Sequence, residues 1–215
     1  MIKAIVFDMD GVLIDARDWH FEALNRALRL FGLEISRYDH LTTFDGLPTR
    51  RKLELLSLQY HLPERLHDFI NQMKQKYTLE IVEAHCRPRF NQQFALARLQ
   101  ATGYRMAVAS NSVRRSIEIM LGRADLSRYF EFFLSNEDVE RPKPDPEIYQ
   151  AAIARLGVDP METLIVEDNQ HGIRAATASG AHVLRVRDVT DVTWRRIARR
   201  IAECDGAATP SRDVP

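Results

Sequence analysis

The chain has 215 residues, of which 45% are hydrophobic and 28% are charged. Because a typical domain has about 150 residues, this length predicts one large domain or one domain that carries an insertion. The composition is that of a globular protein and excludes a disordered chain. Thirty basic residues balance thirty acidic residues, so no net field attracts the chain to nucleic acid or to an anionic membrane.

Cysteine content and hydropathy indicate the compartment. The two cysteines, Cys86 and Cys204, are too few for a disulfide framework or a tetrahedral metal site. Asp8 interrupts the first apolar run, and no later run approaches the roughly 20 apolar residues of a membrane span. We therefore expect a soluble, cytoplasmic protein that has no membrane or nucleic-acid partner.

Short apolar runs predict the strands of a sheet. Residues 2–7 are rich in β-branched side chains and show no clear alternation, which is typical of a strand buried on both faces. Helical patterns such as 148–156 and 172–178 separate the later runs, which lie at 105–109, 130–134, 163–166 and 182–186. This alternation predicts an α/β fold with a doubly wound, Rossmann-like, mostly parallel sheet.

The first two predicted strands are separated by residues 8–104, far more than the dozen or so of a minimal crossover. Apolar residues recur at helical spacing within 18–30, 49–58 and 63–77. We predict a small helical cap domain at 16–85, placed as a lid over the sheet. The core domain would comprise 1–15 and 86–205, followed by a disordered tail at 206–215.

Polar groups follow three of the predicted strands. They are Asp8 and Asp10 after the first strand, Ser110 and Asn111 after the second, and Glu167 and Asp168 after the fourth. Ligands of such sheets bind beyond the carboxyl ends of the strands, so we expect these groups to converge. Two carboxylates this close repel each other unless a cation or a proton lies between them. The oxygen-rich cluster suits Mg²⁺.

Lys143 lies among three prolines within residues 141–146. The prolines stiffen this segment, which could present one ammonium group rigidly or form an ordinary surface turn. Ser110 and Asn111 could cap a helix that starts near Val113, and a helix N-terminus also binds anions. Together the acids, the ammonium and these donors supply what phosphoryl transfer needs: a nucleophile, a proton carrier, a cation site and hydrogen-bond donors.

Four segments resemble, in the correct order, the signature motifs of the haloacid dehalogenase superfamily. They are residues 8–13, 110–112, 143–146 and 166–169 with Gly172, and the resemblance covers residues 1–187. The helical insertion resembles the small α-helical cap of the subgroup that contains phosphoglycolate phosphatases, sugar-phosphate phosphatases and β-phosphoglucomutase.

The resemblance implies a covalent mechanism. Asp8 would attack phosphorus and form an aspartyl phosphate, while Asp10 would protonate the leaving oxygen and then activate water. Mg²⁺ would be held by the Asp8 and Asp168 carboxylates and the Asp10 main-chain carbonyl, with Glu167 in support. The resemblance thus implies a Mg²⁺-dependent phosphomonoesterase.

The resemblance also assigns the phosphate-binding groups. Ser110 and the Asn111 backbone would bind the transferring phosphoryl group, and Lys143 would neutralise its charge. Because the predicted cap is small, we expect the partner to be a small phosphorylated metabolite, a sugar or polyol phosphate, rather than a macromolecule.

Residues 42–51 resemble the cap loop that contacts the leaving group in relatives. The candidate residues for hydroxyls or a second anionic group are Thr43, Asp45 and Arg50, beside Gly46, which permits close backbone approach. A simple turn between helices would explain the same loop. His20 on the first predicted cap helix could modulate Asp10, or could be a partly exposed helix residue.

Two other activities remain possible from the sequence. A sugar phosphomutase like β-phosphoglucomutase often has basic residues around the loop glycine, whereas Asp45 precedes Gly46 here. A phospho-aspartate receiver domain also combines acids, Mg²⁺ and a lysine, but it has no long helical insertion. We therefore expect hydrolysis of a phosphate ester ahead of either alternative.

Overall fold

The computed structural model describes residues 1–206, so nearly all of the predicted tail at 206–215 lies outside the described residues. Five parallel strands form one sheet: β1 (Ala4–Phe7), β2 (Arg105–Ala109), β3 (Phe132–Leu134), β4 (Thr163–Glu167) and β5 (His182–Arg185). Their order is β3-β2-β1-β4-β5. The predicted α/β fold with a parallel sheet is confirmed.

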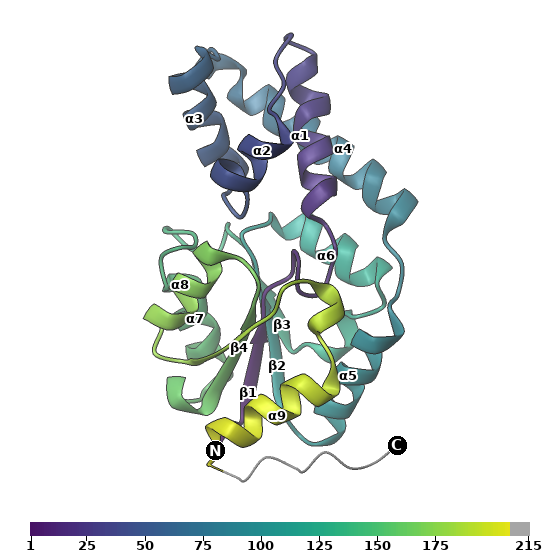
Figure 1. The fold of residues 1–215 in the computed structure, drawn as a ribbon, viewed down its shortest axis with the longest axis vertical. Helices are drawn as coiled ribbons and strands as arrows, with labels where there is room; N and C mark the ends of the chain where they lie inside the picture. The colour runs from purple at the N-terminus through teal and green to yellow at the C-terminus, as the bar shows by residue number, and fades with distance from the viewer. Residues whose placement is uncertain (207–215) are drawn as a thin grey trace.

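Five helices cover the two faces of this sheet: α5 (Phe90–Ala101), α6 (Arg114–Arg123), α7 (Glu147–Leu156), α8 (Gln170–Ala178) and α9 (Trp194–Cys204). Ile5 and Phe7 of β1 pack with α5, α6 and α9 on one face, and Ala4 and Val6 pack with α7 and α8 on the other (Figure 1). Since both faces of the sheet are buried, the residues of β1 that point to one face and those that point to the other are all apolar.

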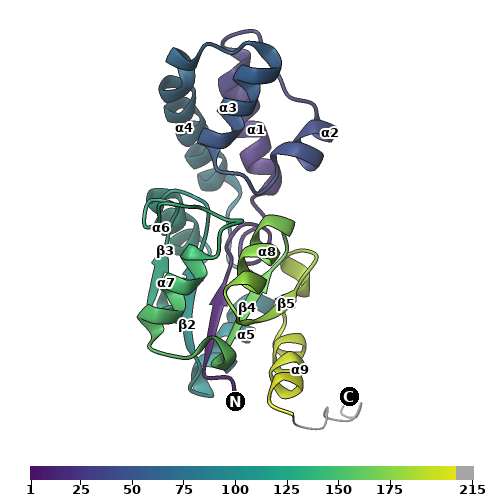
Figure 2. The ribbon, with the colours of Figure 1, turned by 90° about the vertical axis from the view of Figure 1, so that its left-hand side faces the viewer.

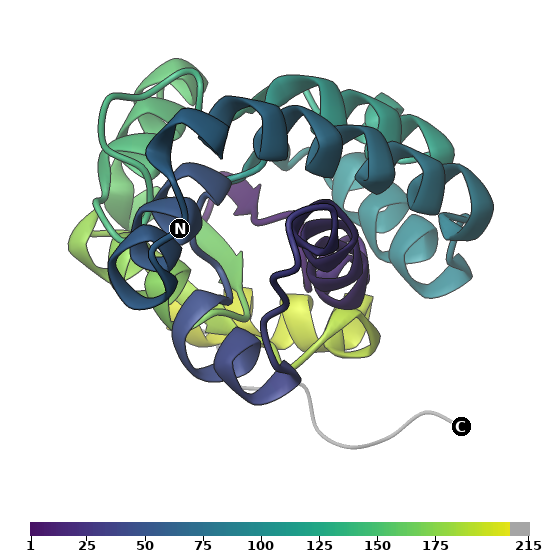
Figure 3. The ribbon, with the colours of Figure 1, turned by 90° about the horizontal axis from the view of Figure 1, so that it is seen from above.

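A helical region made of α1–α4 lies beyond the carboxyl ends of the strands (Figures 1 and 2), and it overlies the end of the sheet when seen from above (Figure 3). Its helices are α1 (Arg17–Arg29), α2 (Arg37–Asp39), α3 (Thr49–Tyr60) and α4 (His67–His85). An apolar cluster of its own includes Leu24, Phe44 and Leu53. This region is consistent with the predicted cap, and the domain bounds stay a prediction.

The helix predicted at 63–77 differs from the observed one. Residues Glu64–Leu66 form a 3-10 turn, and α4 continues from His67 to His85. Pro63 stands at the head of the short turn instead of in the first turn of α4.

Strand order explains why the polar groups meet. β1 is central, with β2 and β3 on one side and β4 and β5 on the other, so the chain reverses direction across the sheet between β3 and β4. Phe7 pairs with Val108 of β2 and with Val166 of β4. The residues that follow these three strands therefore lie side by side at the switch point, where open α/β sheets bind ligands. Among residues 1–206, no helix is long and apolar enough to cross a membrane.

Candidate active site

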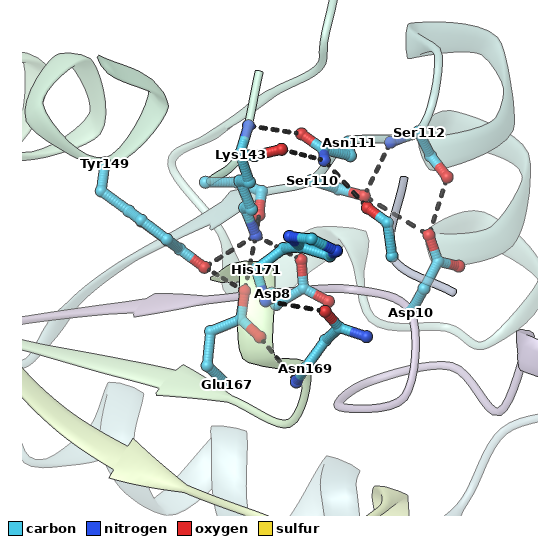
Figure 4. A network of polar contacts seen from close by, with 12 residues as sticks. Asp8, Asp10, Ser110, Asn111, Ser112, Lys143, Tyr149, Glu167, Asn169 and His171 are labelled. Carbon is cyan, nitrogen blue, oxygen red and sulfur yellow. Dashed lines mark hydrogen bonds and ion pairs between the residues drawn. The ribbon is translucent and has the colours of Figure 1, made fainter. Parts of the chain in front are cut away.

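Lys143 is the centre of a buried polar network at the ends of β1 and β4 (Figure 4). Its Nζ donates to Asp8 Oδ1 (2.5 Å), to Glu167 Oε1 (2.8 Å) and to Tyr149 OH (2.7 Å). The Tyr149 hydroxyl in turn donates to Glu167 Oε1 (2.6 Å). Lys143 is only 3% exposed, so the alternative of an ordinary surface turn is wrong.

Charge is distributed unevenly in this network. Burial opposes the charge on Lys143, but Asp8 and Glu167 outweigh that effect and raise the pKa of its ammonium. Burial raises the pKa of Asp8 well above its usual range, and Glu167 and Asp168 add to that rise. One ammonium is therefore not enough to offset the three carboxylates at this edge of the sheet.

Carboxylate oxygens of Asp8, Glu167 and Asp168 lie within 4.8 Å of one another. Asp168 Oδ1 is buried and has no hydrogen-bond partner within the described chain, while its Oδ2 accepts from Arg17 Nη2 (2.9 Å). Burial is the main cause that raises the pKa of Asp168 to about 7, and repulsion from the Glu167 carboxylate is the next largest cause. An unsatisfied buried oxygen in a crowded, all-oxygen cluster is what a hard divalent cation would complete, so these residues fit Mg²⁺.

The carboxylate of Asp10 is held on both sides. Its Oδ2 accepts from Ser112 Oγ (2.7 Å), and its Oδ1 lies 3.1 Å from His20 Nε2. The Nδ1 atom of His20 lies 3.2 Å from Lys74 Nζ, so the neutral tautomer that satisfies both contacts donates to Asp10 from Nε2. Although burial opposes it, His20 and Ser112 lower the pKa of Asp10.

Ser110 and Asn111 have different neighbours from those of a helix cap. The N-cap of α6 is Val113, and Glu137 accepts from the first backbone nitrogen of that helix, Arg114 N (2.7 Å), so the predicted capping role of Ser110 and Asn111 is wrong. Ser110 is 1% exposed and its Oγ accepts from Ser112 N (3.1 Å). The Asn111 side chain accepts from Lys143 N (3.1 Å) and donates to Lys143 O (3.2 Å), which orients the lysine segment.

The loop after the π-helical turn His40–Phe44 touches the core. Gly46 has φ +73°, and a Cβ there would lie 2.5 Å from Asn169 Oδ1, so only glycine allows this approach. The Gly46 carbonyl accepts from Asn111 Nδ2 (3.1 Å). Asp45 Oδ2 accepts from Asn169 Nδ2 (3.2 Å) and pairs with Arg17 Nε (3.2 Å).

Two other predicted loop residues lie elsewhere. Thr43 is exposed and does not line the cavity between the loop and the core. Arg50 lies at the rim of that cavity, but its side chain is 91% exposed and pairs with Glu54 (3.4 Å). Asp45 and Gly46 of this loop therefore approach the core most closely.

The cavity has a volume of about 160 Å³ and is lined by Asp8, Asp10 and His20 together with residues that the sequence did not single out. Those residues include Arg17, Lys52, Lys74 and Ser112, and Tyr149 lies behind the cavity wall in the lysine network. Ser112 could have been found, because it belongs to the same polar segment as Ser110. Tyr149 gave no signal, because an aromatic residue on an apolar helix face is typical of a core position.

Known proteins resemble this chain in sequence. The family described as haloacid dehalogenase-like hydrolase matches residues 5–186. A phosphorylated carbohydrates phosphatase of Thermotoga maritima is 29% identical over 182 residues, covering 83% of this chain and 82% of that protein. A phosphoglycolate phosphatase of Aquifex aeolicus is 28% identical over 179 residues, covering 83% and 82%.

Solved structures agree on the fold. The crystal structure of a β-phosphoglucomutase from Clostridium difficile superposes with a TM-score of 0.81 at 20% identity, covering 94% of this chain and 98% of that one. Because the family match extends over most of the chain, from β1 to the residue after β5, this protein belongs to the haloacid dehalogenase-like hydrolases and is a phosphatase of that family.

Proposed function

We propose that this phosphatase hydrolyses a small phosphorylated metabolite, a sugar or polyol phosphate, through an aspartyl-phosphate intermediate on Asp8 in a Mg²⁺-dependent reaction. The observation that carries this proposal is the placement of two carboxylates in one cavity. Asp8 is tied to Lys143, and Asp10 is tied to Ser112 and His20. The relatives named above supply the substrate class, since one of them acts on phosphorylated carbohydrates.

In the first step, a carboxylate oxygen of Asp8 bonds to phosphorus while the bond between phosphorus and the alcohol oxygen breaks. Asp10 gives its proton to the leaving oxygen. In the second step, Asp10 takes a proton from water, whose oxygen attacks phosphorus and releases phosphate and the free Asp8 carboxylate. Dividing the reaction in this way replaces one difficult displacement by two easier ones.

Asp10 must hold a proton for the first of these steps. Without substrate, its pKa is lowered by His20 and Ser112, so the carboxylate is suited to activate water but not yet to donate a proton. A bound phosphate dianion beside Asp10 would raise the pKa of Asp10, because two like charges disfavour ionisation. Substrate binding would thus protonate the acid that the first step requires.

Mg²⁺ would be held by the carboxylates of Asp8 and Asp168 and by the main-chain carbonyl of Asp10, with Glu167 orienting the set. When bound, the ion neutralises the charge of the phosphoryl group and polarises its oxygens. Glu167 supports this role by accepting hydrogen bonds from the backbone nitrogens of Asp168 (3.0 Å) and Asn169 (3.2 Å).

Lys143 would neutralise further negative charge on the phosphoryl oxygens, because its ammonium already lies against the carboxylate of the proposed nucleophile, Asp8. Ser110 and the backbone of Asn111 would donate hydrogen bonds to the transferring group. The side chain of Asn111 is fully engaged with the backbone of Lys143 and Gly46, which leaves its backbone for the phosphoryl oxygens. These donors stabilise charge that develops in the transition state.

The test compares Asp8→Asn with Asp15→Asn. Asp15 is a matched control, because its side chain is 59% exposed and pairs with Arg89 (3.3 Å) at the surface. With Mg²⁺ and p-nitrophenyl phosphate or glycerol 3-phosphate, Asp8→Asn should lose all measurable turnover and keep its circular dichroism spectrum, while Asp15→Asn keeps normal turnover. Retained turnover in Asp8→Asn would refute the assignment of the nucleophile.

Product identity separates hydrolysis from the two alternatives. β-Glucose 1-phosphate should yield glucose and inorganic phosphate, and formation of a sugar 6-phosphate would instead show mutase chemistry. The phosphorylated protein should decay within seconds, since a lifetime of minutes to hours would indicate a signalling module.

A further inference from the structure

The cavity at Asp8 has walls of opposite charge. The sheet edge contributes four acids, Asp8, Asp10, Glu167 and Asp168, against one ammonium. The helical region contributes one acid, Asp45, which pairs with Arg17 (3.2 Å), and two lysines, Lys52 from α3 and Lys74 from α4; all four residues line the same cavity. Each of these lysines is only 7% exposed, although lysine is rarely buried unless it is paired.

Among residues 1–206 neither lysine has a carboxylate at ion-pair distance, although Asp10 attracts both of them and Asp45 attracts Lys52 from farther away. No carboxylate oxygen lies within 4.0 Å of either Nζ atom: Lys74 contacts only His20 Nδ1 (3.2 Å), and the side chain of Lys52 makes no hydrogen bond. Burial lowers the pKa of Lys52 to about 8. Burial, with repulsion from Lys52, lowers the pKa of Lys74 to about 7. Two unpaired buried ammonium groups that repel each other are costly in the free protein.

Uncharged donors stand next to the lysines. Asn71, Lys74 and Gln75 are three and four residues apart on α4, so they share one face of the helix, and all three line the cavity. An anion that reached this wall would meet two ammonium groups and two amides. Hydrogen bonds from charged donors to an anion are among the strongest that a protein makes.

The second wall is separate from the place of the transferring phosphoryl group. That group must reach the Asp8 carboxylate, beside which lies the ammonium of Lys143. Lys52 and Lys74 come instead from the helical region above the sheet, and neither makes a hydrogen bond to Asp8 or Lys143. Lys74 contacts His20 (3.2 Å), and His20 contacts Asp10 (3.1 Å), the proposed acid for the leaving oxygen, so this wall would face the alcohol part of a bound phosphate ester.

We propose that Lys52 and Lys74 form a second anion subsite, which selects phosphate monoesters whose leaving alcohol carries another anionic group, either a carboxylate or a second phosphate. The inference rests on the proposed hydrolysis at Asp8 and narrows its substrate class. An ester of this kind places its phosphoryl group at the sheet and its second anion between the two ammonium groups. A neutral polyol phosphate would leave both of them unpaired.

Matched substrate pairs test the preference in the wild-type enzyme. Glycerol 3-phosphate and 3-phosphoglycerate share a carbon chain and differ in an alcohol against a carboxylate. Fructose 1-phosphate and fructose 1,6-bisphosphate differ in a second phosphate. At least one anionic member should show a kcat/KM at least about tenfold above its neutral partner, equivalent to about 1.4 kcal/mol. The pair that shows the effect identifies the anion. Equal values in both pairs overturn the proposal.

Variants test whether Lys52 is the cause. In Lys52→Gln the preference for the anionic member should fall about tenfold, mainly through KM, and Lys52→Arg should restore much of it. Lys76→Gln is the matched control, because Lys76 lies on α4, is exposed and does not line the cavity, and it should leave the preference as in the wild type. A preference that persists in Lys52→Gln overturns the assignment.

Binding to the Asp8→Asn variant separates failure of this inference from failure of the proposed hydrolysis. Calorimetry with the same two pairs should show tighter binding of the anionic member, and Lys52→Gln in this background should remove that difference. If the wild-type enzyme hydrolyses none of the four esters but the binding preference is present, the proposed function fails and the anion subsite stands. If the enzyme hydrolyses these esters but shows no preference in binding or in kcat/KM, the proposed function stands and the anion subsite fails.

Discussion

Gly172 on α8 offers a test of how rigidly the acid cluster is held. A Cβ atom at this position would lie 1.7 Å from Glu167 Oε1 and 2.1 Å from Glu167 Cδ. Glu167 cannot move aside without loss, because it accepts from Lys143 (2.8 Å) and Tyr149 (2.6 Å) and from two backbone nitrogens. The substitution Gly172→Ala therefore forces the carboxylate out of its network.

Three terms give the size of the effect. Overpacking a well-filled site costs about 1–3 kcal/mol, and losing a hydrogen bond to a charged group costs about 1.5–3 kcal/mol. Alanine gains at most about 1 kcal/mol over glycine in a helix interior. Gly172→Ala should thus destabilise the protein by about 2–5 kcal/mol, which for a chain of this size lowers the melting temperature by roughly 4–20 °C.

The assay is thermal and chemical denaturation followed by circular dichroism, with turnover of p-nitrophenyl phosphate measured in parallel. Gly122→Ala is the matched control, because Gly122 also lies in a helix, α6, and nothing stands within 4 Å of its Cβ position. That variant should gain about 0.5–1 kcal/mol of stability and keep its turnover. A Gly172→Ala protein as stable and as active as the control would refute the close packing of Glu167.

Further expectations concern charge. Because burial raises the pKa of Asp168 to about 7, the metal-free protein should lose stability as the pH rises toward 7, by at most about 4 kcal/mol. When denaturation is measured in EDTA, the free energy of unfolding of Asp168→Asn should rise relative to that of the wild type over that pH range. Mg²⁺ should raise the melting temperature of the wild type only. The lowered pKa of Lys52, about 8, means that the folded state binds fewer protons than the unfolded state between pH 8 and the usual range near 10. Lys52→Met should therefore exceed the wild type in stability at pH 7, and urea titrations should show the difference shrinking by pH 10. Asp191 accepts from Arg187 (3.0 Å) and pairs with Arg196 (2.8 Å), and these arginines lower the pKa of Asp191. Asp191→Asn should destabilise the protein at pH 7, and the difference should fade as the pH drops below 4, where the unfolded carboxyl takes up its proton.

The sequence was sufficient to predict which side chains meet at the carboxyl ends of the strands. Asp8 and Glu167 each follow a buried apolar run, and parallel strands bring such positions together whatever the details of side-chain packing. The structure brings both residues to one ammonium, that of Lys143. A role of His20 beside Asp10 was one of two alternatives from the sequence, suggested by the place of a histidine in relatives, and the structure shows the contact between the two residues (3.1 Å).

Contacts across the cavity could not be predicted in the same way. Arg17 reaches Asp168 (2.9 Å) and Asp45 (3.2 Å), which are far from it in the sequence. Tyr149 faces Lys143 because α7 packs on the sheet with that side turned inward. These contacts depend on how helices rotate against their neighbours, and a pattern of residues does not fix that rotation.

By itself, the sequence determined the parallel sheet, the residues at the strand ends and the family. Tertiary structure alone decided the charge of the opposite wall. Arg50, Arg51 and Lys52 are three consecutive basic residues, yet the first two pair with Glu54 at the surface, while Lys52 is buried in the cavity. Successive residues of a helix point about 100° apart, so only the packing of α3 selects which of the three cations is buried at the cavity.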